Sequence, residues 1–247
     1  MYDCDLCLGY VPGCKPCLSL EELMAATGRA GLSGGLIRTT ITNLSGLVTG
    51  NQMLAEALNA LPEGYYGMWA LSPSCVGEVA SPQALPAQMV QSHIRALYVD
   101  PKDHQFLARP SVMGDYYAMA EERRIPLYLC TDYGLSLGEI DDILAAFPKL
   151  TCILNFCETW PSMRRLYPFL ERYENLRLDI AYQWDDQGIE RLVRRFGAER
   201  LLMGSYFPQL YIGGMLTYVH CAEISEADKE AILGGNFERM LREEELC

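Results

Sequence analysis

The chain has 247 residues, half of them hydrophobic, so it is long enough to bury one large core. Its formal net charge of −12 argues against nucleic acid and anionic membranes as partners. Solubility alone accounts for such a charge.

The beginning of the chain predicts a cytoplasmic protein. The opening residues, M-Y-D-C-D, are acidic and lack the basic and apolar regions of a signal peptide. No apolar run approaches the roughly 18–20 residues needed to span a bilayer. In a reducing compartment the ten cysteines are expected to be thiols, several of them packed as small core residues.

Short β-rich runs alternate with amphipathic helical runs along the chain. Capping boxes at Ser19/Glu22 and Ser136/Glu139 begin two of the helices, and the first helix should end before Gly31. The other helices are expected near residues 53–61, 84–91, 115–122, 162–172 and 187–196, with a last one beginning at 225. The expected strands cover residues 2–5, 35–40, 65–70, 95–100, 126–130, 151–155, 176–180 and 200–205.

This succession of strand-then-helix units predicts a closed (β/α)₈ TIM barrel with parallel strands. We expect one domain over residues 1–247, with an extra C-terminal helix. An open doubly wound sheet is the alternative. It normally contains fewer units, and no G-x-G-x-x-G turn follows the first strand here.

Three segments of the second half resemble the amidohydrolase-related family of metal-dependent hydrolases and decarboxylases. Residues 196–208, FGAERLLMGSYFP, resemble its eighth strand, F-G-x-D-R-[LI]-[LM]-[FWY]-G-S-D-x-P. Residues 232–241, ILGGNFERML, resemble its closing I-L-x-G-N-A-x-R-L-L helix, and residues 145–150, AAFPKL, resemble its approach to the sixth strand. The resemblance implies a TIM barrel, hydrolase chemistry on a small carboxylate or amide-type substrate, and a bound metal such as zinc.

The positions at which that family carries its metal ligands hold other residues in this chain. The family's opening D-x-H-x-H-x-G reads D-C-D-L-C-L-G at residues 3–9, so Asp5 and Cys7 stand where two histidines are expected. Cys130 stands at the next histidine position, at the end of the fifth strand.

Two further family positions also differ. Phe156 occupies the fitting position after the sixth strand, and Tyr206 replaces the catalytic aspartate of G-S-D-x-P. The resemblance therefore implies the family's fold more firmly than its zinc-water chemistry.

A hydrolytic zinc site needs about three protein ligands and one open position for water. The three histidines of the chain cannot assemble such a site, because His93 and His220 are expected away from the rim of the barrel. Asp5, Cys7 and Cys130 are the remaining metal candidates, and the absence of any metal is the alternative. Three anionic ligands would hold zinc more readily than they would activate its water.

Strand alternation predicts where the side chains of the first strand point. Asp5 and Cys7 should share one face, toward the barrel axis, and Cys4 should pack under the helices on the other.

Charged and polar groups near strand ends form the candidate ligand site, because the carboxyl-terminal rim of a barrel carries ligands. Arg38 could clamp a carboxylate through two hydrogen bonds. The full set of expected ligand-binding residues is Arg38, Asp100, His104, Asp132, Phe156, Glu158, Ser205 and Tyr206.

Three functions follow from these residues. The first is a hydrolase-like enzyme with a remodelled rim, and the second is a non-catalytic barrel that binds a small ligand or a protein partner. The third is a thiol redox role of Cys14 and Cys17, a C-x-P-C pair before a helix N-terminus, where the helix dipole favours a thiolate. A small molecule in the barrel mouth is the expected partner, and a second copy of the chain is a further candidate.

Overall fold

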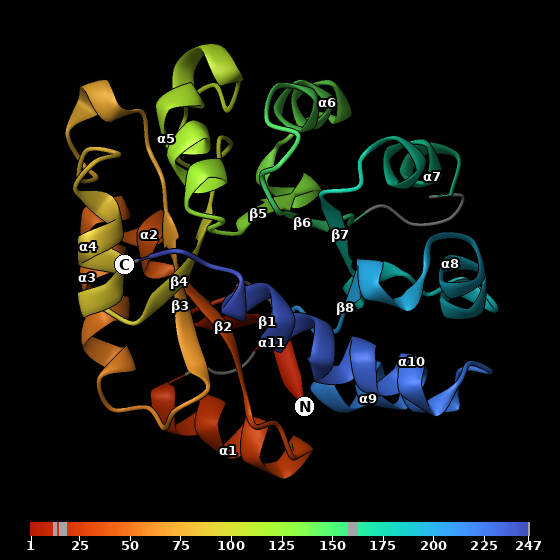
Figure 1. Cartoon of the computed structure of the whole chain (residues 1–247). Coiled ribbons are helices and arrows are strands. Elements are labelled where there is room, and N and C mark those ends of the chain that lie inside the picture. Colours follow the sequence, from red (N-terminus) through yellow and green to blue (C-terminus); the bar gives the residue numbers. More distant parts are fainter. Residues whose placement is uncertain (12–13, 15–18, 158–162, 247) are drawn as a thin grey trace.

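Eight parallel strands form a barrel in which each strand neighbours the next one in sequence (Figure 1). The computed structural model describes the whole chain except residues 12–13, 15–18, 158–162 and 247. The strands are β1 (Tyr2–Leu8), β2 (Gly34–Thr39), β3 (Tyr65–Ala70), β4 (Ile94–Tyr98), β5 (Leu127–Cys130), β6 (Cys152–Asn155), β7 (Leu176–Asp179) and β8 (Leu201–Leu202). The predicted (β/α)₈ TIM barrel is confirmed.

The ring is nearly closed between its last and first strands. The backbone N–H of Cys4 donates to the Met203 carbonyl at 2.9 Å, and that of Cys7 donates to the Phe207 carbonyl at 2.9 Å. The eighth strand is shorter than predicted because the chain after Leu202 reaches β1 through these separate bonds and one parallel bridge from Leu6 to Phe207.

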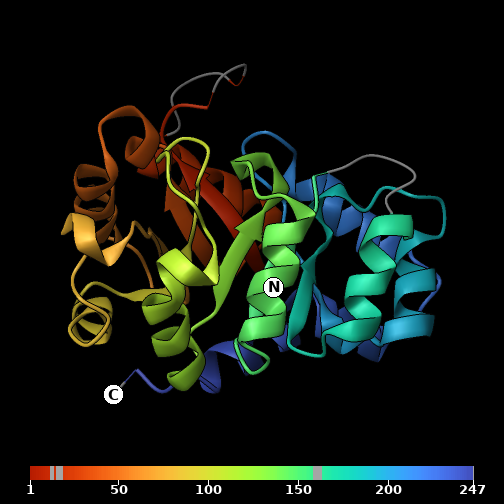
Figure 2. The same ribbon diagram turned by 90° about the horizontal axis from the view of Figure 1, so that it is seen from above.

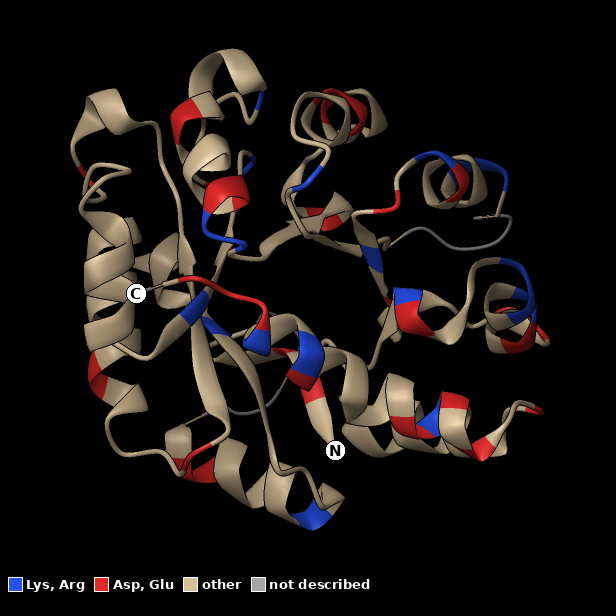
Figure 3. Ribbon diagram, in the orientation of Figure 1, with Lys and Arg blue, Asp and Glu red and all other residues tan. Residues whose placement is uncertain are grey.

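Helices surround the strands, and Figure 2 shows them beside the sheet from a second direction. They are α1 (Leu20–Ala30), α2 (Ile41–Leu44), α3 (Leu47–Leu58), α4 (Leu85–Gln91), α5 (Pro110–Glu122), α6 (Leu137–Ala146), α7 (Met163–Arg172), α8 (Gly188–Phe196), α9 (Ile212–Cys221), α10 (Glu226–Glu230) and α11 (Asn236–Arg242). Among the described residues, none of these helices has the length and apolar character required to cross a membrane. Acidic and basic residues are distributed around the ring of helices (Figure 3).

The predicted capping boxes are present at the starts of α1 and α6. Ser19 accepts from the Glu22 amide and Ser136 from the Glu139 amide, while each glutamate accepts from the amide of its serine. Gly31 ends α1 at φ 71°, a left-handed conformation that suits glycine. Helix α9 was not predicted, because its first turn contains two adjacent glycines, which have low helix propensity.

Buried side chains form two layers. The larger one, the outer layer, lies between the strands and the helices. The smaller one, the inner layer, fills the inside of the barrel. Helix α11 contributes Phe237, Met240 and Leu241 to the inner layer, and the Phe237 ring stacks on Tyr2 at 5.0 Å. Because Tyr2 begins β1, α11 covers the amino-terminal end of the barrel and leaves the carboxyl-terminal end for a site.

The expected placement of Cys4 under the helices is wrong. The register of β1 against β2 shifts between Asp3 and Leu6, and Cys4 packs in the inner layer while Leu6 packs in the outer one. A β-bulge of this kind interrupts the strict alternation of side chains. Cys4 therefore faces the inside of the barrel, which is the side that Asp5 and Cys7 also face.

Candidate functional site

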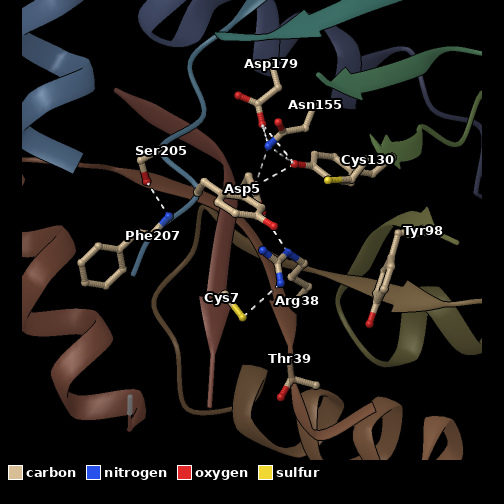
Figure 4. A network of polar contacts seen from close by, with 12 residues as sticks. Asp5, Cys7, Arg38, Thr39, Tyr98, Cys130, Asn155, Asp179, Ser205 and Phe207 are labelled. Carbon is tan, nitrogen blue, oxygen red and sulfur yellow. Dashed lines mark hydrogen bonds and ion pairs between the residues drawn. The ribbon is translucent and has the colours of Figure 1, made fainter. Parts of the chain in front are cut away.

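Arg38 lies near the carboxyl-terminal end of β2, and its guanidinium connects two side chains of β1 (Figure 4). Its Nε donates to Asp5 Oδ1 at 3.0 Å, and its Nη1 donates to Cys7 Sγ at 3.2 Å. The rings of Tyr133 and Tyr206 have their centres 5.5 and 5.2 Å from the guanidinium carbon. Arg38 is 8% exposed and Asp5 is completely buried.

These neighbours keep Arg38 charged despite its burial. Burial by itself lowers the pKa of an arginine, but the acidic groups of Cys7, Tyr133 and Asp5 raise the pKa of Arg38 well above its ordinary value. Asp5 and Arg38 thus form a buried ion pair at the base of the barrel mouth.

A chain of hydrogen bonds continues from Asp5 across the barrel interior. The Tyr128 hydroxyl lies 2.7 Å from Asp5 Oδ2 and 3.1 Å from Asp179 Oδ2. The Asn155 amide nitrogen lies within 3.3 Å of Asp5 Oδ2, of the Tyr128 hydroxyl and of Asp179 Oδ2.

Tyr128 and Asn155 donate the hydrogen bonds of this network, and the carboxylates of Asp5 and Asp179 accept them. Burial and the charge of Asp5 raise the pKa of Asp179 well above its ordinary value. A tyrosine has a single hydroxyl proton. The Tyr128 hydroxyl therefore donates to Asp5 Oδ2 or to Asp179 Oδ2, and the Asn155 amide donates to both carboxylates.

Asp3 ties β1 to the segment after β8. Its Oδ1 accepts from the backbone amides of Asp5 and Ser205 at 3.0 Å each, and its Oδ2 has no hydrogen-bond partner among the described residues. Burial raises the pKa of Asp3 to about 7.

A cavity of about 310 Å³ opens above Arg38 at the carboxyl-terminal end of the strands. Asp132 accepts from the Tyr206 hydroxyl at 3.3 Å, and Asp100 accepts from Asn43 at 2.8 Å. The residues that line the cavity include three tyrosines, two cations and three acids, namely Tyr98, Tyr133, Tyr206, Arg38, Lys102, Asp100, Asp103 and Asp132.

The backbone after β8 turns Tyr206 toward this cavity. Tyr206 has φ 53°, in the left-handed region that non-glycine residues rarely adopt. Gly204, two residues earlier, lies so close to β7 that an added Cβ would be 2.2 Å from Asp179 Oδ1. The glycine and the unusual turn together place the Tyr206 ring over Arg38.

A pair of thiols lies beside the hydrogen-bond chain. Cys130 Sγ and Cys157 Sγ are 3.4 Å apart, and Cys157 Sγ donates to Asn155 Oδ1 at 3.1 Å. The hydrogen bond with Cys130 and burial both raise the pKa of Cys157.

Several residues singled out from the sequence come together at this mouth. The cavity wall contains Cys7, Arg38, Asp100, Asp132 and Tyr206. Asp5 lies beneath them, bonded to Arg38.

Other expected ligand-binding residues lie elsewhere. Phe156 is fully buried in the outer layer, because strand alternation turns Asn155 inward and Phe156 outward. Ser205 is also fully buried, and its hydroxyl accepts from the Phe207 amide. His104 does not line the cavity, and both its ring nitrogens are buried without a hydrogen-bond partner in the described part of the chain.

The redox candidates are described only in part. Cys14 Sγ donates to the Pro208 carbonyl at 3.4 Å. Cys17 and the ligand candidate Glu158 lie outside the described residues.

Reasoning from the sequence missed Tyr128 and Asn155, which complete the buried network. A usable signal was present, because Asn155 is a polar residue that ends an otherwise apolar buried strand. Tyr128 is two residues before Cys130, so strand alternation puts both on the same face.

The described residues do not fit a metal site of the family type. Among them, no three His, Cys, Asp or Glu side chains are grouped so that they could hold a metal ion. Arg38 donates to both Asp5 and Cys7, so a divalent cation bound to these two would meet a fixed positive charge. Cys130, the third metal candidate, contacts Cys157.

Comparison with known proteins gives one family and a set of similar folds. The family model described as amidohydrolase matches residues 81–242, more than half of the chain. No curated protein is similar enough in sequence to be matched to this chain.

Three solved structures illustrate the structural similarity. An uncharacterised TIM-barrel protein from Bordetella bronchiseptica is 22% identical, with a TM-score of 0.67 over 91% of this chain and 83% of the other. A 2,6-dihydroxybenzoate decarboxylase from Rhizobium is 15% identical, with a TM-score of 0.70 over 98% and 97%. A dihydroxybenzoic acid decarboxylase from Polaromonas, with bound manganese and the inhibitor 2-nitroresorcinol, is 14% identical, with a TM-score of 0.69 over 98% and 96%. At these identities the similarity shows the fold.

Proposed function

Since this chain belongs to the amidohydrolase family, we propose that it binds a small organic carboxylate in the cavity above Arg38, without the metal-bound water of a family hydrolase. The observation that carries this proposal is the buried Arg38, which stays cationic and lines the cavity.

Arg38 and Lys102 supply the positive charge for the carboxylate. Within the described residues, Nε and Nη1 of Arg38 are engaged by Asp5 and Cys7, which leaves Nη2 for a ligand. Lys102 is exposed on the same cavity wall. Charge-assisted hydrogen bonds of this kind are about twice as strong as neutral ones.

The rest of the cavity selects for a small ligand that has an apolar face and hydrogen-bond donors. Its volume of about 310 Å³ is at the lower end for ligand pockets. Tyr98, Tyr133 and Tyr206 offer aromatic surface, while Asp100 and Asp132 accept hydrogen bonds and repel a second negative charge. A hydroxyl- or amide-bearing monocarboxylate meets these conditions, and the decarboxylases of similar fold are named for 2,6-dihydroxybenzoate and dihydroxybenzoic acid.

Titration calorimetry with benzoate, 2,6-dihydroxybenzoate and benzamide tests the proposal. We expect the carboxylates to bind more tightly than the amide. Arg38→Met should weaken carboxylate binding about tenfold or more, because a hydrogen bond to a charged group contributes about 1.5–3 kcal/mol.

Lys102→Met provides a second test at an exposed residue whose loss should not affect folding, and it should weaken the same binding by a smaller factor. Arg109→Met, at an exposed arginine outside the cavity, is the matched control and should bind like the wild type. Equal carboxylate affinity in the wild type and in folded Arg38→Met and Lys102→Met proteins would overturn the proposal.

A second candidate is metal-dependent turnover of a carboxylate or amide, and the bound manganese of the similar decarboxylase favours it. Elemental analysis after incubation with manganese or zinc tests it. One ion per chain, lost in both Asp5→Asn and Cys7→Ser, would make this the better assignment.

A further inference from the structure

Two thiols meet at the carboxyl-terminal end of the barrel, next to the network that supports Arg38. Cys130 ends β5, and Cys157 follows β6 by two residues. Their sulfur atoms are 3.4 Å apart, which is within hydrogen-bond distance for thiols. Cys130 is completely buried and Cys157 is half-buried, so a reagent from solution reaches Cys157 first.

The backbone already holds the two residues in adjacent positions. Strands β5 and β6 are paired in register, with Cys130 opposite Asn155. The Cys157 amide also donates to the Thr131 hydroxyl at 2.9 Å, which fixes the chain after β6 against the chain after β5. Closing a disulfide therefore needs side-chain rotation and a movement of the sulfurs to about 2.05 Å, without a change of strand pairing.

We propose that Cys130 and Cys157 form a reversible disulfide by exchange with a low-molecular-weight disulfide such as oxidised glutathione. Cys157 loses its proton to solvent, and its sulfur attacks one sulfur of the glutathione disulfide, which breaks that S–S bond, forms a mixed disulfide and releases one glutathione thiolate that takes up a proton. Cys130 then loses its proton and attacks Cys157 Sγ, which forms the internal S–S bond, breaks the mixed disulfide and releases the second glutathione thiolate, and this thiolate takes up a proton. The two protein thiols are oxidised by two electrons, and one glutathione disulfide is reduced to two thiols.

Oxidation changes the network beneath the cavity through Asn155. The thiol of Cys157 donates to Asn155 Oδ1, and the same side chain contacts Asp5 and Asp179 through its nitrogen. A disulfide sulfur has no proton to donate, so Asn155 loses this hydrogen bond when the bridge forms. The redox state of the pair thus acts on the residue that positions Asp5 beside Arg38.

Peptide mapping of the full chain tests the proposal. The protein carries Cys75→Ser and Cys221→Ser, which remove two exposed thiols that would link separate chains. It is incubated in mixtures of reduced and oxidised glutathione, quenched with acid, alkylated and mapped by mass spectrometry without reduction. We expect a cross-linked peptide that joins Cys130 to Cys157. Its amount should increase to one link per chain as the proportion of oxidised glutathione rises, and it should disappear after treatment with dithiothreitol.

Single variants separate the two steps. In Cys130→Ser the second step is blocked, so Cys157 should accumulate as the mixed disulfide with glutathione. In Cys157→Ser the buried Cys130 should stay reduced. Cys152→Ser, at a completely buried cysteine in the outer layer, is the matched control and should form the same link as its parent.

Recovery of Cys130 and Cys157 as free thiols at every glutathione ratio, in protein with unchanged circular dichroism, would overturn the proposal. Predominant links from either residue to another cysteine would do the same. The mapping needs no ligand, so its outcome is independent of the proposed carboxylate binding.

Discussion

Arg38 contacts an acid and a thiol of β1, and its guanidinium faces two tyrosine rings. At the scale of single residues, the cationic Arg38 therefore contacts Asp5 and Cys7, the two residues that stand where the family has histidines. A buried charge is stable only when a partner compensates it. Asp5 and Arg38 are such partners, and neither is expected to tolerate loss of the other.

Arg38→Met should lower the free energy of unfolding by about 3–5 kcal/mol, because it leaves Asp5 buried without its counter-charge. Urea unfolding at neutral pH measures the change. Arg38→Lys keeps the charge without the planar geometry, so its loss should be smaller. A loss below about 1 kcal/mol in Arg38→Met would mean that the pair is not compensating a buried charge.

Asp3 makes the stability depend on pH in a direction opposite to that of a paired carboxylate. The pKa of Asp3 is about 7 in the folded chain because of burial, whereas an unfolded aspartate has a pKa of about 3.9. Between these values the folded chain binds more protons. The stability contributed by protonated Asp3 is fully present below about pH 4 and is lost as the pH rises to about 7.

Asp3→Asn should remove this component. Relative to the wild type, the variant should gain stability between pH 4.5 and pH 7.5, by an amount on the order of 4 kcal/mol at most. Urea unfolding at the two pH values measures the difference between the proteins. Identical pH dependence of the two would show that Asp3 does not hold its proton in the folded chain.

At the scale of elements, β1 and α11 determine which end of the barrel is open. The bulge in β1 interrupts the alternation of its side chains, and α11 closes the opposite end with apolar side chains. Both features depend on contacts between distant parts of the chain, such as the stacking of Tyr2 on Phe237.

Phe237→Ala should destabilise the protein by about 3–5 kcal/mol, because it removes a ring that is 2% exposed and opens a cavity at the base of the barrel. Chemical denaturation measures the loss. Tyr211→Ala removes an aromatic ring that is 84% exposed and should change the stability by less than about 0.5 kcal/mol. Similar losses in the two variants would contradict a structural role for α11 at this end.

At the scale of the whole molecule, the barrel has the family's architecture while its mouth holds a cation in contact with two candidate metal ligands. A resident metal contributes to stability in proportion to its affinity for the folded state. Arg38 already compensates Asp5, so the folded state needs no divalent ion for this purpose.

Dialysis against a chelator should therefore leave the thermal unfolding midpoint unchanged within about one degree, and later addition of zinc or manganese should not raise it. Differential scanning calorimetry makes the measurement. Arg38→Met is the informative comparison, since freeing Asp5 and Cys7 from the guanidinium should create metal-dependent stabilisation. A midpoint that falls after chelation in the wild type would support the metal-dependent alternative.

Local patterns in the sequence were sufficient to predict the barrel. Capping at Ser19 and Ser136, the glycine after α1 and the recurrence of apolar strands are short-range signals, and a closed ring satisfies all of them together. The same patterns placed Arg38, Asp100 and Asp132 near strand ends, and the family resemblance singled out Cys7 and Tyr206. All five line the cavity.

Only the tertiary structure determined which of these groups touch. Cys4 faces inward at a bulge whose position depends on the pairing of β1 with β2. Phe156 faces outward because its neighbour Asn155 points into the barrel and side chains alternate along a strand. The contact of Arg38 with Asp5 and Cys7 joins residues about thirty positions apart, and that of Tyr128 with Asp5 spans far more of the chain. Strand register and burial set such contacts, and neither is encoded in the spacing of residues along the chain.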